Sequence, residues 1–478
     1  MPKTIFGTTE KSNFILNMKS ETLQKWIHGV LACCIMIPLI GAAVLTLLAK
    51  INYFSAAILY ATGFTCVLFF LIVMLKKDML FKDNKSYLLI IALALTAVIS
   101  YYGTLSKSAD YIKVALLGNL GRYEGLLAIL SYLGIFLLAT AVSKESTVER
   151  LFDLLVGAGT VEAFVALLQH LPFDFNTSDY KDLPTIAYEN VFLSSGLTGS
   201  PIFYGAITTL TGAVAVMGAV YSPSKRRAKL YAAAALFIFL TGMFTCSAVP
   251  LIGEAAVILT VIIIEAVNSA KFGGVKFDGK LLNTSLKRAG AMVAGLILTF
   301  VIVLFTQGFY FRDRPIAFYD SFYRLFITNT MTLTDHGKGN IPYTVEFWKE
   351  QWGFALETAN AAPVTGVGPD CLAFARGQEA NYNDKCYNEF LYIAATRGYI
   401  SLAAYAALII STIVVLCKRM KQFFGDKSKW YIPCMTAAVI GYVVQSCFNA
   451  SSITTAPFFW LMLGMVWATR LGKSEKDS

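Results

Sequence analysis

Long apolar runs and short polar connections alternate along most of the chain. A helix needs about 20 mostly apolar residues to cross the roughly 30 Å hydrocarbon core of a bilayer, and many runs approach that length. The pattern therefore predicts an all-α polytopic membrane protein with about twelve transmembrane helices. The predicted spans are residues 26–49, 51–75, 87–103, 124–142, 151–171, 200–221, 230–246, 249–268, 289–308, 399–417, 431–449 and 454–469.

These runs divide the chain into five parts, namely 1–25 (cytoplasmic segment), 26–308 (spans 1–9), 309–398 (a large extracytoplasmic loop), 399–469 (spans 10–12) and 470–478 (cytoplasmic tail). The loop far exceeds the roughly 12–15 residues beyond which a connection is usually functional or disordered. Within it, residues 344–361 place apolar side chains at helical spacing. That spacing predicts a partly helical loop, with an amphipathic helix on the outer membrane surface or over a lipid-borne substrate.

Composition excludes the soluble and disordered classes. Hydrophobic residues make up 56% of the chain and charged residues 15%, whereas soluble domains carry about a quarter charged residues. The formal charge of +10 reports orientation rather than nucleic-acid binding, because 27 of the 40 Lys and Arg residues fall in the segments assigned to one side. By the positive-inside rule that side is cytoplasmic and holds both termini.

Two acidic residues, Glu162 and Glu254, lie within predicted spans. Ionisable side chains inside a membrane are costly, and they mark functional sites by default. The alternative for each is a protonated or locally paired acid.

Three stretches at the end of the long loop form an ordered set. Val364–Asp370 contains a Gly-x-Gly-Pro turn, Asp384–Leu391 contains Tyr-Asn-Glu, and Gly398–Leu402 begins the last group of spans. Gly121–Leu126 and Gly199–Gly205 belong to the same set further upstream. Together with the largest outer loop between spans 9 and 10, these stretches resemble the O-antigen ligase and Wzy-type polymerase superfamily.

The resemblance implies a membrane glycosyltransferase, either a ligase or a polymerase. Such an enzyme moves glycan from an undecaprenyl-pyrophosphate-linked oligosaccharide to a glycan, lipid or protein acceptor. It works on the outer face of the bacterial cytoplasmic (plasma) membrane, in cell-surface polysaccharide or cell-wall biosynthesis, without a nucleotide sugar. We expect no cofactor and no nucleic-acid partner; a polysaccharide assembly complex is the further partner that this reading suggests.

The chain departs from the family pattern in three places. Tyr387 stands where the family has a proposed catalytic His, and Ser247-Ala248 replaces an expected Ser-Arg pair. An arginine expected shortly before Trp348 is absent, and residues 337–340 read Gly-Lys-Gly-Asn. Either the site uses other residues, or its chemistry differs, or activity is lost.

Glycosyl transfer from a lipid pyrophosphate needs a base for the acceptor hydroxyl and cations for the departing pyrophosphate. Glu389 and Asp370 are the candidate bases, and the alternative for each is a solvated loop charge or a turn cap. Tyr387 is a poor base, because its reference pKa is about 10, but it can donate a hydrogen bond or stack on a sugar. The candidate phosphate-binding cations, for which contact with lipid headgroups is the alternative, are Arg122, Arg324, Lys338, Lys385 and Arg397.

Cysteine and histidine usage adds two expectations. Cys371 and Cys386 both fall in the extracytoplasmic loop, where a disulfide would be permitted. The alternative is a pair of free thiols. No spacing of cysteines or histidines is typical of a metal site, so we expect no metal.

Two other functions remain open from the sequence. A transporter or flippase for lipid-linked sugar is compatible with twelve spans and with the acids Glu162 and Glu254. A non-catalytic family member in a polysaccharide assembly complex is compatible with the three departures.

Overall fold

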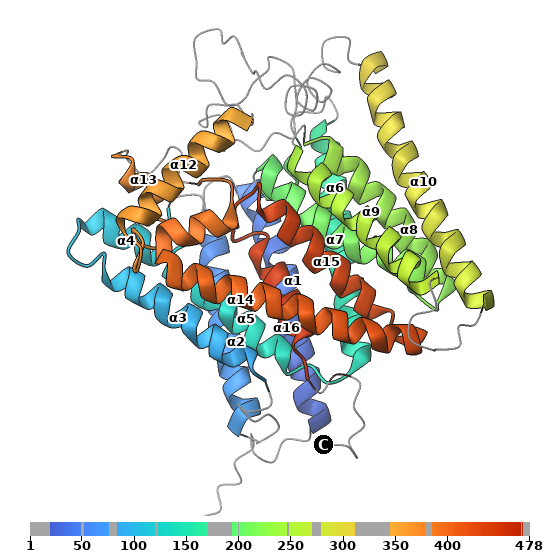
Figure 1. Cartoon of the computed structure of the whole chain (residues 1–478), viewed down its shortest axis with the longest axis horizontal. Coiled ribbons are helices and arrows are strands. Elements are labelled where there is room, and N and C mark those ends of the chain that lie inside the picture. Colours follow the sequence, from blue (N-terminus) through green and yellow to red (C-terminus); the bar gives the residue numbers. More distant parts are fainter. Residues whose placement is uncertain are drawn as a thin grey trace, which may run out of the picture.

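A computed structural model of the chain describes residues 20–48, 52–75, 84–119, 123–170, 194–198, 200–245, 248–269, 279–310, 345–377, 385–469 and 471. All regular secondary structure in these ranges is helical, which confirms the all-α class (Figure 1). The helices are α1 (Ser20–Leu48), α2 (Asn52–Leu75), α3 (Ser86–Tyr102), α4 (Ala109–Leu117), α5 (Leu126–Thr140), α6 (Glu145–His170), α7 (Pro201–Tyr221), α8 (Lys225–Met243), α9 (Ala248–Ser269), α10 (Gly279–Tyr310), α12 (Val345–Ala361), α13 (Leu372–Ala375), α14 (Glu389–Gly425), η5 (Lys427–Lys429), α15 (Tyr431–Ser446) and α16 (Ala456–Val466).

Six described helices are long and apolar enough to cross a membrane, and α3, α5 and α16 are shorter apolar helices. The chain thus has the helices of a polytopic membrane protein. Each of the twelve predicted apolar runs overlaps a helix, so their helical character is confirmed, while the number of spans stays a prediction. The six stretches are Ala56–Leu75, Glu145–Gln169, Pro201–Tyr221, Val249–Asn268, Thr284–Val303 and Glu389–Gly425.

Several of these helices expose large apolar side chains. On α2, Phe64 is 65% exposed and Leu71 is 49% exposed, and on α10 Ile297 and Leu298 are more than half exposed. Several large apolar side chains exposed on one helix are unfavourable in water. Lipid chains offer such faces a matching environment, since every backbone polar group of a helix is already bonded internally.

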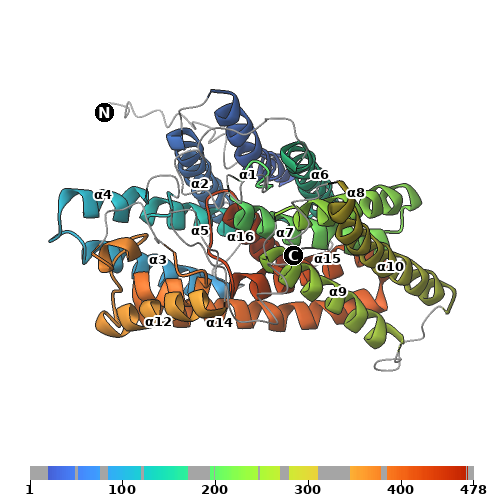
Figure 2. The ribbon, with the colours of Figure 1, turned by 90° about the horizontal axis from the view of Figure 1, so that it is seen from above.

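The helix α7 forms the centre of one half of the fold, with α6, α8, α9, α10 and α15 around it (Figure 2). All residues from Ile202 to Tyr221 are buried. Two glycines of α7 admit aromatic rings of α8: a Cβ on Gly212 would lie 2.1 Å from the Phe239 ring, and one on Gly218 would lie 2.0 Å from the Tyr231 ring. Small residues of this kind allow membrane helices to pack closely.

In the other half, α14 packs against both α3 and α12, while α5 packs against α2 and α16 (Figure 2). The predicted helix over 344–361 is confirmed as α12. Its buried face contacts protein, because Ala355 packs with Tyr392 and Ala395 of α14. The amphipathic pattern of α12 is therefore satisfied at least in part by α14 rather than by lipid alone.

The start of α14 differs from the sequence-based expectation. The helix begins at Glu389, ten residues before the predicted span, and continues through a kink at Gly398, whose φ is +82°. Glycine is required there, because a Cβ would lie 2.2 Å from the carbonyl oxygen of Val364. The apolar pattern alone did not reveal the first turns, since they carry polar residues that the fold buries.

Candidate functional site

The kink at Gly398 positions one wall of a polar cluster. In an unbroken helix the N–H of Tyr399 would donate to the carbonyl of Ala395. Here it donates instead to the carbonyl of Pro363, at 2.8 Å. The kink therefore leaves the last carbonyls before Gly398 available to other donors.

The turn over residues 366–371 uses those carbonyls. The N–H of Val367 donates to the carbonyl of Ala395 at 3.0 Å, and that of Gly368 donates to the carbonyl of Thr396 at 2.9 Å. The Gly-x-Gly-Pro stretch is thus held against α14 by main-chain hydrogen bonds, and Asp370 is placed at the end of that turn.

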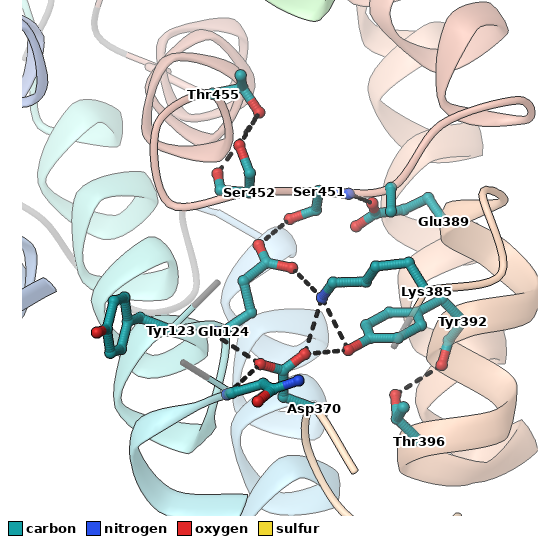
Figure 3. Close-up of polar contacts among 12 residues, drawn as sticks. Tyr123, Glu124, Asp370, Lys385, Glu389, Tyr392, Thr396, Ser451, Ser452 and Thr455 are labelled. Atoms are coloured by element: carbon teal, nitrogen blue, oxygen red, sulfur yellow. Dashed lines mark hydrogen bonds and ion pairs between the residues drawn. The ribbon is translucent and has the colours of Figure 1, made fainter. Parts of the chain in front are cut away.

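Four parts of the chain that are distant in the sequence meet at this point: Asn119 with residues 123–124 before α5, 366–371, 385–392 at the start of α14, and 449–452 between α15 and α16 (Figure 3). Three non-glycine residues in the described ranges have a positive φ, and all three belong to these segments. They are Tyr123, Asp370 and Tyr387, with φ between 52° and 56°. Backbone strain of this kind persists only where surrounding contacts enforce it, and it clusters at functional sites.

Lys385 lies at the centre of the cluster. Its Nζ donates to Oε2 of Glu124, to Oδ1 of Asp370 and to the hydroxyl of Tyr392, each at 2.8 Å (Figure 3). The side chains of Lys385, Glu124 and Asp370 are at most 5% exposed. An ammonium has three N–H donors, and all three have acceptors here. The structure thus gives Lys385 a buried, fully bonded environment that differs from the phosphate contact expected from the sequence.

Asp370 is equally enclosed. Its Oδ1 also accepts a short hydrogen bond from the Tyr392 hydroxyl, and its Oδ2 accepts from the backbone N–H groups of Asn119 and Glu124, at 2.7 and 3.3 Å. Burial by itself raises the pKa of Asp370, but the charge and hydrogen bond of Lys385, with the other donors, outweigh it and hold the pKa below its ordinary value. An acid held in its ionised form this firmly is a weak proton acceptor.

Glu389 has a more open arrangement. Its Oε2 accepts from the backbone N–H of Ser451 at 2.7 Å, whereas its Oε1 has no hydrogen bond within the described ranges. The Ser451 hydroxyl donates to Oε1 of Glu124 at 2.6 Å, so Ser451 bridges the two acids (Figure 3). Glu389 also interacts electrostatically with Arg397, a buried cation of the same helix. Of the two predicted bases, Glu389 is the one with an oxygen available to accept a proton.

The fold therefore brings together four of the residues singled out in the sequence, namely Asp370, Lys385, Glu389 and Arg397. Tyr387 lies beside them and packs on an aromatic cluster that includes Trp348. The predicted cations Arg122, Arg324 and Lys338 lie outside the described residues.

The two acids Glu162 and Glu254 belong to a different part of the fold, on α6 and α9. Glu162 is paired locally, because its Oε2 accepts the backbone N–H of Leu197 at 2.6 Å. Glu254 is 4% exposed, and its Oε1 has no hydrogen-bond partner within the described part of the chain. Gly242 of α8 makes room for this oxygen, since a Cβ there would lie 2.5 Å from it.

Of the two alternatives left open for Cys371 and Cys386, a disulfide or a pair of free thiols, the structure has the free thiols. Each cysteine packs in a separate apolar cluster: Cys371 contacts Val114 and Ala115 of α4, whereas Cys386 packs with Ala355 of α12. Burial raises the pKa of both thiols, that of Cys386 to about 12. The two cysteines are close in the sequence, but the fold buries them in different apolar clusters.

Several members of the cluster were missed by sequence reasoning. Glu124 falls inside the stretch Gly121–Leu126, so the motif includes this carboxylate, but the sequence alone gives it no role. Tyr392 and Ser451 carried none, because a tyrosine in a helix and a serine in a short connection are common. Arg376 of the loop was also missed; it is partly buried, donates to Oε1 of Gln351 and lies over the Phe354 ring, while its Nε has no hydrogen-bond partner among the described residues.

The cluster as a whole combines three carboxylates with two cations, all largely shielded from water. Low local polarity strengthens each interaction and makes an unpaired charge costly. No group of three Cys, His or acidic residues within the described ranges is arranged to hold a metal ion. The arrangement holds a carboxylate, Glu389, within electrostatic range of a guanidinium, Arg397, which suits proton transfer close to an anionic group.

Comparison of the chain with protein-family models and with curated proteins finds no match. Function is therefore inferred from the geometry of the cluster and from the sequence stretches that form it.

Proposed function

We propose that the protein transfers or polymerises glycan from an undecaprenyl-pyrophosphate-linked oligosaccharide on the outer face of the cytoplasmic membrane. The reaction would serve cell-surface polysaccharide biosynthesis, with a glycan, lipid or protein as the acceptor. The proposal takes its reaction class from the sequence resemblance and its residues from the polar cluster.

One observation carries the proposal. Lys385, Glu124 and Asp370 come from three separate stretches of the resemblance, and they hydrogen-bond directly to one another. Gly398, from a fourth stretch, provides the kink that holds the turn before Asp370. Motifs that are distant in the sequence but converge in space are expected when they build one site.

Within this cluster Glu389 is the proposed general base. An acceptor hydroxyl attacks the anomeric carbon of the donor sugar, and its proton passes to Oε1 of Glu389. The bond between that carbon and the pyrophosphate oxygen breaks, and its electron pair leaves with undecaprenyl pyrophosphate. Arg397, which interacts electrostatically with Glu389, can stabilise the developing negative charge.

Arg376 is a further cation for the leaving group. It lies within electrostatic range of Tyr387, two positions before Glu389, and its Nε has no partner among the residues that the structure describes. Planar guanidinium groups suit phosphate oxygens better than ammonium groups do. The buried Lys385, by contrast, serves to position Glu124 and Asp370.

The test is glycan transfer by the purified, reconstituted protein carrying Glu389→Gln. The amide keeps the size of the side chain and can still accept the N–H of Ser451, but it cannot take a proton. We expect transfer to fall by about 10²–10⁴-fold, with an unchanged unfolding temperature.

Glu357→Gln is the matched control, because Glu357 is an exposed acid on the neighbouring helix α12. It should leave transfer unchanged. If Glu389→Gln is folded and transfers glycan at the wild-type rate, Glu389 is not the base.

A transporter or flippase is the second candidate function, and Oε1 of Glu254, which has no hydrogen-bond partner in the described ranges, favours it. A buried carboxylate between packed membrane helices suits proton or solute coupling. Reconstituted vesicles distinguish the two functions: movement of lipid-linked sugar across the bilayer that Glu254→Gln abolishes, without any glycan transfer, would support the transporter.

A further inference from the structure

An aromatic cluster adjoins the proposed base. Trp348 and Trp352 stand one turn apart on α12, with ring centroids 6.5 Å apart and planes inclined by 11°. The Phe448 ring lies 5.2 Å from Trp348 and 5.8 Å from Trp352, and Tyr387 packs against the same group. The four rings come from three segments, so the tertiary fold assembles them.

Both indole N–H groups of the cluster lack an acceptor. Nε1 of Trp348 and Nε1 of Trp352 are shielded from solvent and have no hydrogen-bond partner in the described part of the chain. Trp348 as a whole is only 6% exposed. Buried tryptophans usually find an acceptor for this donor, so each of these two adjacent donors lacks an acceptor that a ligand oxygen could supply.

The cluster is tied to the proposed base through the chain at two points. Tyr387 precedes Glu389 by two residues, so their Cα atoms are at most about 7 Å apart. Phe448 precedes Ser451, whose N–H donates to Glu389, by three residues. Tyr387, whose φ is positive, contributes its own ring to the aromatic cluster. A ligand that rests on these rings would therefore extend toward Glu389.

The chemistry of the cluster favours a sugar ring over the isoprenoid chain of a lipid carrier. The C–H faces of a pyranose can pack against aromatic rings, and its hydroxyl and ring oxygens can accept hydrogen bonds from indole N–H groups. An isoprenoid chain would occupy the same apolar surface but would leave both donors unbonded, which is unfavourable for buried groups.

We propose that Trp348, Trp352, Tyr387 and Phe448 form a subsite that binds a sugar ring of the glycan substrate. The inference rests on the proposed glycan-transfer function and assigns it a specificity-determining surface. The rings contribute stacking area, and the two indole N–H groups contribute polar contacts that orient the sugar.

The experiment measures binding of lipid probes to the detergent-solubilised full chain by microscale thermophoresis. The probes are undecaprenyl pyrophosphate without sugar and the same lipid bearing glucose, galactose, N-acetylglucosamine or N-acetylgalactosamine. We expect the wild type to bind at least one sugar-bearing probe about tenfold more tightly than the bare lipid. Trp352→Leu should remove this difference, and Trp352→Phe, which keeps a ring but loses the N–H, should reduce it about threefold.

Trp26→Phe is the matched control, because Trp26 is 54% exposed on α1; it should change nothing. Trp352 is chosen over Trp348 because it is less buried, and unfolding temperatures verify that each variant is folded. The proposal is overturned if the wild type does not distinguish any sugar from the bare lipid. It is also overturned if Trp352→Leu weakens all probes equally, which would indicate an isoprenoid site, or leaves the sugar preference intact.

The two proposals fail separately. If the protein transfers no glycan but Trp352→Leu still removes a sugar preference, the subsite stands and the transfer function fails. If glycan transfer depends on Glu389 while the sugar preference survives in Trp352→Leu, the transfer function stands and the subsite fails.

Discussion

Two charged networks lie at opposite ends of α15, and they differ in burial. At its end, beyond Ser446, Lys385 pairs with Glu124 and Asp370, and all three side chains are at most 5% exposed. At its start, Arg227 pairs with Glu149 at 2.9 Å and with Asp153 at 3.1 Å, and these side chains are 25–43% exposed.

The two networks also differ in what surrounds the cation. Arg227 lies 5.2 Å from the centre of the Trp430 ring, and the indole of Trp430 donates to Glu149. Water can still reach this network and replace a lost partner. The Lys385 side chain is 1% exposed, so water cannot readily replace a lost partner and the buried network depends on each of its members. The Lys385 network therefore sets the geometry of the proposed site, whereas the Arg227 network contributes to packing between helices.

The largest expected effect is that of Lys385→Met. The substitution leaves the carboxylates of Glu124 and Asp370 buried side by side without a cation, which should cost about 3–5 kcal/mol of the free energy of unfolding. Thermal unfolding of the purified protein in detergent measures the loss. Lys349→Met removes an exposed lysine of α12 and should have no effect. A Lys385→Met protein as stable as the wild type would show that the buried pairing is not needed for folding.

An intermediate effect is expected from protonation of Asp370. Its pKa in the folded protein lies below its ordinary value of about 3.9. Its stabilising contribution is therefore complete above about pH 4 and is lost as the pH falls through the lower, folded pKa. At pH 7 we expect Asp370→Asn to lower the free energy of unfolding by about 1–3 kcal/mol. The difference in unfolding temperature between this variant and the wild type should become smaller in acid, where Asp370 of the wild type is protonated.

Unfolding temperatures measured from pH 7 down to pH 3 check this expectation. Asp110→Asn is the control, since Asp110 is an exposed residue in the first turn of α4. If the difference in unfolding temperature between the wild type and Asp370→Asn does not change with pH, the charge on Asp370 is not what stabilises the network.

The smallest expected effect is that of Arg227→Met. Its ion pairs are partly exposed, and such pairs contribute about 0–1 kcal/mol. The same thermal unfolding assay should show little change, and glycan transfer should persist. A loss as large as that of Lys385→Met would remove the distinction between the two networks.

Parts of the site could be predicted from single residues. The end of the long loop contains two carboxylates that can act as bases, Asp370 and Glu389. It also contains two cations that suit a phosphate, Lys385 and Arg397. Their roles could not be assigned, because a role depends on partners. Lys385 was expected to face phosphate but is saturated by two carboxylates and a phenol. Ser451, which bridges two of the acids, lies more than sixty positions from Glu389 and gave no signal.

The hydrophobic pattern by itself determined the all-helical class, the helical character of all twelve apolar runs and the helix at α12, because these follow from local spacing and apolar length. Only the tertiary structure decided that Cys371 and Cys386 stay apart and that α14 begins at Glu389 with a kink at Gly398. It also decided which charges are buried. The physical reason is that burial and pairing arise from contacts between segments hundreds of residues apart, and no local periodicity encodes them.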